Sequence, residues 1–194
     1  AAQAQQAPGA HAEDRAAVER VTDFSAPLSA PQPLTPHHIR EGFDCGEFSL
    51  DQWLVRRALA NQQAGASRTF VVCIEQTVVA YYCLAAGAVT VEQSTPRLRR
   101  NMPDPIPVII LGRLAVARPV QNRGIGRALL RDALARSAQA ADAIGVRGLL
   151  VHALSESAAV FYENAGFSRS PLLPSMLMVT LADLHQAFAE AAKG

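Results

Sequence analysis

The chain has 194 residues and a net charge of +1, with 49% hydrophobic and 18% charged residues. This length predicts one folded domain, and the apolar content excludes an intrinsically disordered chain. No apolar run reaches the roughly 18 residues of a membrane-spanning helix, and the first residues lack the basic and apolar regions of a signal peptide. The three cysteines show no C-x-x-C spacing, so we expect a protein of the reducing cytoplasm without disulfides or a metal site.

Residues 1–37 differ in composition from the rest of the chain, being rich in alanine, glutamine and proline. Such a composition is typical of a linker, although Glu13–Phe24 could form one short helix. We expect residues 1–37 to be an N-terminal extension, poorly ordered or docked as a short helix, and residues 38–194 to form the domain. Residues 97–136 contain nine arginines and two acids, a local charge of +7, which suggests an anionic ligand.

The first predicted element of the domain is a helix over Ser49–Ala64, where Ser49 and Gln52 form a capping box. Two runs of β-branched and aromatic residues follow, Thr69–Glu75 and Val78–Val91, and they predict an antiparallel hairpin. A proline-rich loop then leads to a further strand over Val108–Val116.

The second half of the chain alternates helices and strands. An amphipathic pattern predicts a long helix over Gly124–Ile144, and the apolar run Leu149–Leu154 after it predicts a buried parallel strand. A helix over Ser155–Asn164, with Ser155 as its cap, precedes a last strand over Met176–Leu181 and a C-terminal helix from Asp183. This order predicts a mixed α/β domain with one parallel crossover in its middle.

The loop between the strand Val108–Val116 and the helix after it is the most informative stretch. It reads Gln121-Asn122-Arg123-Gly124-Ile125-Gly126-Arg127-Ala128. Its glycines let the backbone approach a ligand closely, and the N–H groups of the first helical turn form an anion site together with two arginines. The structural alternative is that the glycines only permit a tight turn from strand to helix.

This loop and its context resemble the GNAT superfamily of N-acetyltransferases. The resemblance rests on Gln121-x-x-Gly124-x-Gly126 after the strand, and on Phe161–Phe167 as a similar late helix and turn. It implies an α/β (α+β) GNAT fold, with a mostly antiparallel sheet around a central strand–helix unit, and acetyl-CoA as the co-substrate. A bulge near Leu114–Val116 would hold the pantetheine arm and polarise the thioester carbonyl. The implied cofactor-binding residues are Leu114, Ala115, Val116, Gln121, Asn122, Arg123, Gly124, Ile125, Gly126, Arg127, Ala128 and Asn164.

Further segments are similar to the acetyltransferase toxins of type II toxin–antitoxin modules. They are Phe43–Glu47, Leu50–Leu54, Gly65–Val72, Ala80–Tyr82, Leu84–Gly87, Leu111–Val116 and Leu150–Ala153. This resemblance spans about Leu34 to Leu184 and implies transfer of acetyl to the α-amino group of aminoacyl-tRNA, which blocks translation. It also implies a ribbon–helix–helix antitoxin as partner, and a homodimer. An extension of 37 residues before the domain is not expected in that family.

Tyr162 is the candidate catalytic residue. A phenol can donate a proton to a departing thiolate, and the resemblance places the matching tyrosine beside the thioester sulfur. The alternative is that Tyr162 only packs the last helix against the sheet. An α-amino group has a pKa of about 7.7–8.0 and is partly neutral at pH 7, so its attack on a thioester does not require a strong base.

The other residues that could carry chemistry are assigned structural roles. Tyr81 and Tyr82 should face opposite sides of one strand, and His152 should be a hydrogen-bonded histidine within a strand. Glu156 and Glu163 share a helix face, and we expect them to be solvated charges. We expect all three cysteines in the core.

A bound tRNA requires cationic surface that follows its phosphates. The candidates are Arg56, Arg57, Arg68, Arg97, Arg99 and Arg100, and we expect half of them to contact tRNA. Two alternatives to the toxin hypothesis stay open. One is a GNAT enzyme that acetylates a small amine or a protein N-terminus, and the other is a non-catalytic module that binds CoA or a partner.

Overall fold

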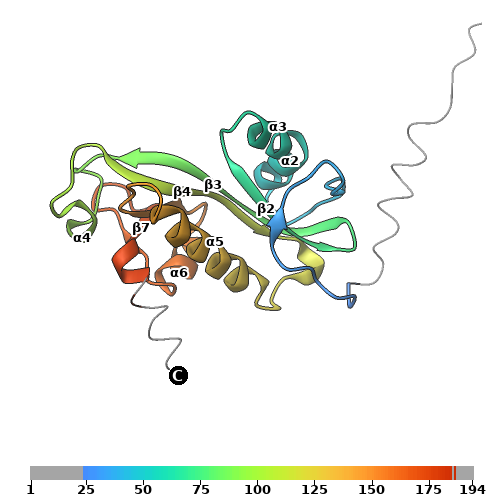
Figure 1. Cartoon of the computed structure of the whole chain (residues 1–194). Helices are drawn as coiled ribbons and strands as arrows, with labels where there is room; N and C mark the ends of the chain where they lie inside the picture. The colour runs from blue at the N-terminus through green and yellow to red at the C-terminus, as the bar shows by residue number, and fades with distance from the viewer. Residues whose placement is uncertain (1–23, 185, 187–194) are drawn as a thin grey trace, which may run out of the picture.

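The protein is built on one mixed sheet with helices on both faces, as Figure 1 shows for the computed structural model, which describes residues 24–184 and 186. The strand order is β1-β2-β3-β4-β5-β7-β6. The strands are β1 (Gln32–Pro33), β2 (Arg68–Ile74), β3 (Thr77–Val89), β4 (Ile106–Val116), β5 (Gly148–His152), β6 (Ser168–Arg169) and β7 (Met176–Thr180). The helices are α2 (Phe48–Arg56), α3 (Ala58–Gln63), α4 (Pro96–Arg99), α5 (Ile125–Ala141) and α6 (Glu156–Glu163), with a 3-10 turn at Arg118–Val120.

The predicted hairpin and the predicted parallel crossover are both confirmed. Strands β2 and β3 pair antiparallel across the turn after Ile74, whereas β4 and β5 pair in parallel, with Ile109 opposite Leu149. Helix α5 connects β4 to β5, and the remaining strand pairs are antiparallel. In the described part of the chain, no helix is both long and apolar enough to cross a membrane.

The predicted capping box at the first helix is wrong. Helix α2 begins at Phe48, one residue earlier than predicted, so Ser49 already lies inside the first turn and cannot cap it. The residue before the helix, Glu47, makes no side-chain cap either. The carboxylate of Asp51 in the first turn instead accepts a hydrogen bond of 2.9 Å from the main-chain N–H of Cys45. The predicted single helix also divides, because Arg57 leaves helical geometry between α2 and α3.

The N-terminal boundary expected after residue 37 falls inside the folded domain. Strand β1 pairs with β2, and the Leu34 side chain after it is 2% exposed in the core. The Ser29 hydroxyl accepts a hydrogen bond from the main-chain N–H of Cys73. Most of the predicted helix Glu13–Phe24 lies outside the described residues, as does most of the predicted C-terminal helix, of which residues 181–184 are helical.

Two adjacent tyrosines of β3 link the sheet to the helices on its two faces, as the strand alternation predicts. Tyr81 stacks on Trp53 of α2 at 5.9 Å between ring centroids, and its hydroxyl donates to the carbonyl of Leu50 over 2.8 Å. Tyr82 faces α5, where its hydroxyl donates to Asp132. Both tyrosine side chains are fully buried. The sheet is therefore anchored on both sides directly beside the place where β4 and β5 separate.

Candidate active site

The two parallel strands in the middle of the sheet separate part-way along their length. The last residue pair between them is Leu111 opposite Val151. Strand β4 then continues to Val116 with only β3 beside it, while β5 ends at His152. Beyond Leu111, the edge of β4 that faces β5 therefore has main-chain groups without a partner strand. A linear ligand could bind along this edge.

A β-bulge marks the start of this separation. Cys83 of β3 lies opposite Arg113, whereas the next residue, Leu84, lies opposite Leu111, so Gly112 is the extra residue on β4. The prediction of a bulge near Leu114–Val116 is therefore wrong. A side chain at position 112 would begin 3.2 Å from the Cys83 sulfur, which explains why the extra residue is a glycine.

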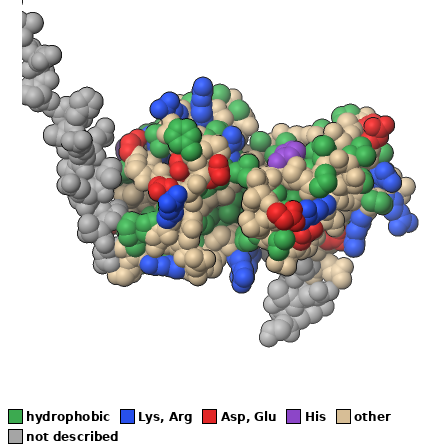
Figure 2. Space-filling view, turned by 180° about the vertical axis from the view of Figure 1, so that it is seen from behind, with side chains coloured by type: hydrophobic (Ala, Val, Ile, Leu, Met, Phe, Trp, Pro, Cys, Tyr) green, Lys and Arg blue, Asp and Glu red, His purple; other side chains and the backbone are tan. Residues whose placement is uncertain are grey.

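A pocket of about 320 Å³ occupies the space between the separated strands. Its lining comes from four elements or their flanks: Glu47, Ser49 and Leu50 at α2; Leu111, Gly112, Arg113 and Leu114 of β4; Val151, His152, Ala153, Leu154 and Ser155 at β5; and Ala158 and Tyr162 of α6. Figure 2 shows the molecule hollowed between the part that carries α2 and α3 and the rest of the sheet.

Tyr162 is the tyrosine whose hydroxyl is available to a ligand. Its ring is 7% exposed and packs against Phe161 and Phe167, with centroids 5.1 and 5.6 Å away. Burial raises the pKa of Tyr162 to about 12, so the phenol is protonated at physiological pH. The hydroxyls of Tyr81 and Tyr82 are bonded to protein groups, whereas that of Tyr162 has no partner among the described residues.

The glycine-containing loop forms an open cradle at the start of α5. Asn122 and Gly124 both have left-handed backbone angles, with φ of 61° and 78°, and no side chain caps the helix. A Cβ on Gly124 would meet nothing within 4 Å, so the space in front of the loop is free. The first-turn amides and the positive end of the helix dipole therefore suit a diphosphate.

A scan against family models matches residues 65–169 to the acetyltransferase (GNAT) domain. The chain belongs to the GNAT acetyltransferase family. The family predicted from the sequence is thereby confirmed, as is the prediction of an acetyl-CoA-dependent N-acetyltransferase. The separated strands, the bulge and the amide cradle are the features of this chain that fit a thioester of CoA.

Individual relatives of the acetyltransferase are toxins. The chain is 50% identical over 155 residues to the "tRNA-acetylating toxin" of Mycobacterium tuberculosis, covering 80% of this chain and 93% of the relative. Among solved structures, AtaT complexed with acetyl-methionyl-tRNAfMet matches with a TM-score of 0.76 at 26% identity, over 84% of this chain and 99% of that one. A tyrosine-to-phenylalanine mutant of AtaT, bound to the C-terminus of the antitoxin AtaR and to acetyl-CoA, matches with a TM-score of 0.72 at 26% identity and the same coverage.

Two predicted cofactor-binding side chains of the acetyltransferase contact its own main chain. Gln121 donates hydrogen bonds of 2.9 Å to the carbonyls of Cys45 and Val116. Arg123 donates one of 2.6 Å to the carbonyl of Phe24. These side chains therefore shape the loop, and its main-chain N–H groups are left to face a ligand.

A second pocket, of about 520 Å³, lies between α5 and α6. It is lined by Arg127, Leu130, Arg131, Leu134, Phe161, Asn164 and Ala165. The structure thus brings two predicted residues, Arg127 and Asn164, together in one place. Sequence reasoning missed Arg131, although its spacing of four from Arg127 places both on one side of α5.

The structure corrects the expectation for one residue of the pocket and adds a binding partner for two others. His152 is exposed and lines the pocket, and among the described residues its imidazole ring has no hydrogen-bond partner, contrary to the expectation of a hydrogen-bonded histidine. Glu156 and Glu163 are exposed charges as predicted, but both carboxylates also form ion pairs with Arg169. Glu47, which sequence reasoning missed, is the carboxylate that lines the pocket.

Of the three cysteines, Cys73 and Cys83 are buried as predicted, whereas Cys45 is half-buried.

The six predicted tRNA-binding arginines are all exposed but do not form one patch. Arg56, Arg57 and Arg68 lie at the end of α2 and the start of β2. The other three lie in or directly after α4, near the opposite end of the sheet (Figure 1). Arg97 is additionally paired with Asp183, and Arg68 donates to the carbonyl of Gln62.

Proposed function

We propose that this acetyltransferase is the toxin of a type II toxin–antitoxin module, which transfers acetyl from acetyl-CoA to the α-amino group of aminoacyl-tRNA and so blocks translation. The observation that carries the proposal is 50% identity to a tRNA-acetylating toxin over 93% of that protein. The pocket at the separated strands supports it, because an unpartnered tyrosine hydroxyl and an unpaired strand edge meet there.

Tyr162 is the general acid of the proposed reaction. Acetyl-CoA supplies an activated acetyl group as a thioester. The bond between the acceptor nitrogen and the carbonyl carbon forms as the carbon–sulfur bond breaks, and Tyr162 donates its proton to the departing sulfur. The proton lost by the acceptor nitrogen restores the phenol, which balances the transfer. A phenol held protonated by burial is a donor throughout the physiological pH range.

The acceptor nitrogen must be neutral when it attacks. An α-amino group meets this requirement in part at pH 7, since its pKa is about 7.7–8.0. Two groups on the pocket wall, Glu47 and His152, are placed to take a proton from the remaining ammonium form, directly or through water. A lysine side chain, with a pKa of about 10.4, has a far smaller neutral fraction at pH 7 than an α-amino group.

The main chain of β4 and α5 orients the co-substrate. The edge of β4 over Leu114, Ala115 and Val116 receives the pantetheine arm and polarises the thioester carbonyl, through main-chain groups other than the Val116 carbonyl, which accepts from Gln121. The amides of residues 124–127 hold the diphosphate, since the N–H of Ala128 already donates to the carbonyl of Gly124. Arg127 and Arg131, with Asn164, bind the nucleotide end in the second pocket.

The arginines nearest the acyl pocket are the proposed first contacts with tRNA. Helix α2 contributes Leu50 to the pocket and carries Arg56 near its other end, so Arg56, Arg57 and Arg68 can meet phosphates close to the acceptor end. Arg97, Arg99 and Arg100 on and after α4 would contact phosphates farther along the tRNA.

The partners proposed for the chain are an antitoxin with a ribbon–helix–helix DNA-binding part and a second copy of the toxin. A structural relative at 26% identity is bound to the C-terminus of its antitoxin. Because aminoacyl-tRNA and acetyl-CoA occur together in the cytoplasm, we place the protein there.

Incubation of the protein with acetyl-CoA and a complete set of charged tRNAs tests the proposal. Mass spectrometry of the amino acids released from the tRNA should detect an N-acetyl derivative of at least one of them. The matched control is Tyr162→Phe, which should yield far less product. If no charged tRNA is acetylated while a small amine or a protein N-terminus is, the enzyme class stands and the proposed substrate is wrong.

A further inference from the structure

Helix α6 lies between the two pockets of the acetyltransferase and contributes to both. Tyr162 lines the acyl pocket, whereas Phe161, Asn164 and Ala165 line the second pocket against α5. A small rotation of this helix about its axis would therefore move the Tyr162 hydroxyl away from the reacting sulfur. Misplacement of a catalytic group by about 1 Å can reduce a rate about a hundredfold.

The packing of α6 alone fixes that rotation weakly. The helix has eight residues, of which Ala159 and Tyr162 are buried and Ala158 and Phe161 are partly buried against the core, so apolar packing covers one side of it. Val160 is 44% exposed. Ser155 caps the first turn by accepting from the N–H of Ala158, but this bond acts along the helix axis and not against rotation.

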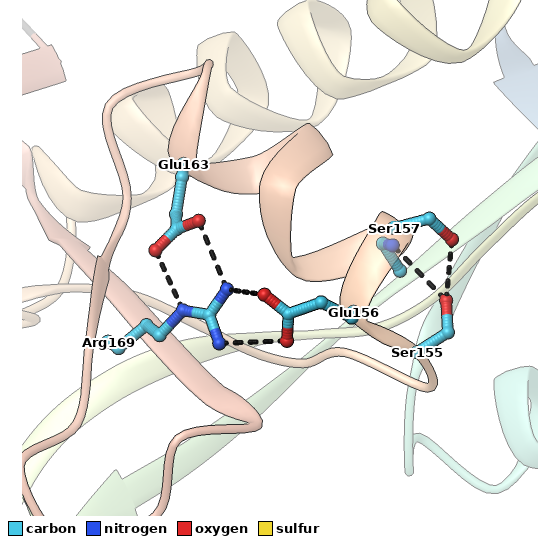
Figure 3. A network of polar contacts seen from close by, with 6 residues as sticks. Ser155, Glu156, Ser157, Glu163 and Arg169 are labelled. Atoms are coloured by element: carbon cyan, nitrogen blue, oxygen red, sulfur yellow. Dashed lines mark hydrogen bonds and ion pairs between the residues drawn. The ribbon is translucent and has the colours of Figure 1, made fainter.

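Arg169 holds α6 at both ends (Figure 3). Its Nε and Nη2 donate to Glu163 over 2.7 and 3.1 Å, and its Nη1 and Nη2 donate to Glu156 over 3.0 and 2.5 Å. Each carboxylate is thus bound by two N–H groups of one planar guanidinium. The ion pairs raise the pKa of Arg169 and lower the pKa values of both glutamates, so the contact persists at neutral pH.

The arginine is itself anchored to the sheet. Arg169 lies on β6 and pairs with Leu177 of β7, and β7 pairs with β5, whose end forms a wall of the acyl pocket. Glu156 and Glu163 are two helical turns apart and share a face, while Tyr162 projects about 100° from Glu163. Fixing the glutamate face against β6 therefore fixes the direction of the tyrosine relative to β5.

We propose that Arg169 is a positioning residue for acetyl transfer, which sets the rotation of α6 through Glu156 and Glu163 and thereby aims the Tyr162 hydroxyl. This inference rests on the proposed role of Tyr162 as the acid. It predicts that Arg169→Ala lowers kcat at least tenfold, while the KM for acetyl-CoA and for the acceptor changes by less than about threefold. The kcat of Arg169→Lys should lie between those of wild type and Arg169→Ala, because a lysine ammonium cannot bind two carboxylates with paired hydrogen bonds as a planar guanidinium does.

A double-mutant cycle separates positioning from a general loss of structure. Because Arg169 acts through Tyr162, Arg169→Ala should cost much less kcat in the Tyr162→Phe background than in wild type. If Arg169 had a purely structural role, Arg169→Ala would lower kcat by the same factor in both backgrounds. The Arg118→Ala variant, which removes the exposed ion pair to Asp44 away from α6, controls for the loss of a surface ion pair and should keep wild-type kcat.

The assay uses whichever acceptor amine the wild type acetylates. If charged tRNA is not acetylated, the proposed substrate fails, and the same variants are then compared on a small amine. The positioning role is overturned if Arg169→Ala keeps wild-type kcat, or if its cost is equal with and without the Tyr162 hydroxyl. The positioning role is supported if Arg169→Ala lowers kcat only in the wild-type background and keeps the melting temperature and the affinity for acetyl-CoA.

Discussion

The side-chain amide of Gln121 donates a 2.9 Å hydrogen bond to the main-chain carbonyl of Val116, the last residue of β4. The same nitrogen donates to the carbonyl of Cys45, in the loop before α2. One side chain thus joins the end of the central strand, the start of the diphosphate loop and the segment that leads into α2. The loop is held in shape before any ligand binds.

Replacing Gln121 should therefore weaken acetyl-CoA binding more than catalysis. We expect Gln121→Ala to raise the dissociation constant for acetyl-CoA by about tenfold, because two hydrogen bonds worth about 1 kcal/mol each preorganise the loop. Isothermal titration calorimetry measures the change. The control is Gln76→Ala, in the exposed β2–β3 turn, which should bind like wild type. Equal affinities of the Gln121 variant and wild type would contradict the preorganising role.

Tyrosine-to-phenylalanine substitutions at positions 162 and 82 should have opposite consequences. Tyr162→Phe removes a hydroxyl without a protein partner, so we expect acetyl transfer to fall at least a hundredfold with little change in stability. Tyr82→Phe removes a donor to Asp132 and should cost about 1–3 kcal/mol of unfolding free energy. Kinetics and denaturant unfolding of both variants measure the difference. A destabilised but active Tyr162→Phe enzyme would show that Tyr162 is only a packing residue.

The stability of the protein should fall in alkaline solution, partly through Tyr162. Its pKa is about 12 when folded and about 10 when unfolded, so the unfolded state loses the proton first. The contribution of Tyr162 to the free energy of unfolding is fully present below pH 10 and is lost as the pH rises to about 12. The change in the free energy of unfolding is about 2–3 kcal/mol. Unfolding free energies between pH 8 and pH 12 should decline less steeply for Tyr162→Phe than for wild type. Parallel curves would contradict burial of this phenol.

Arg131 should contribute to acetyl-CoA binding although no loop motif contains it. It lines the second pocket one turn from Arg127, so Arg131→Ala should weaken acetyl-CoA binding by about five- to tenfold. The effect should shrink as salt is added, because these arginines are exposed and their attraction to phosphate is screened. Binding of wild type and variant at low and at high salt measures both points. An effect independent of salt would indicate lost packing instead.

Local sequence patterns predicted the central elements well because each pattern depends on neighbouring residues. The β-branched runs predicted the β2–β3 hairpin, and Ser155 caps α6 as predicted. The capping box at Ser49 failed because helix α2 begins at Phe48, which leaves Ser49 inside the first turn and not at the cap position. Residue spacing alone does not fix a helix boundary to within one or two residues.

The sequence by itself determined the sheet-and-crossover fold, the glycine loop at the start of α5 and the identity of the single tyrosine in α6, because these follow from periodicity, turn residues and motif. Only the tertiary structure decided that the bulge lies at Gly112, that Gln121 binds the strand end, and that Arg131 and Glu47 line pockets. It also decided that Glu156 and Glu163 share one arginine. Each of these depends on contacts between segments distant in the chain, and no local pattern encodes which side chain arrives from the other segment.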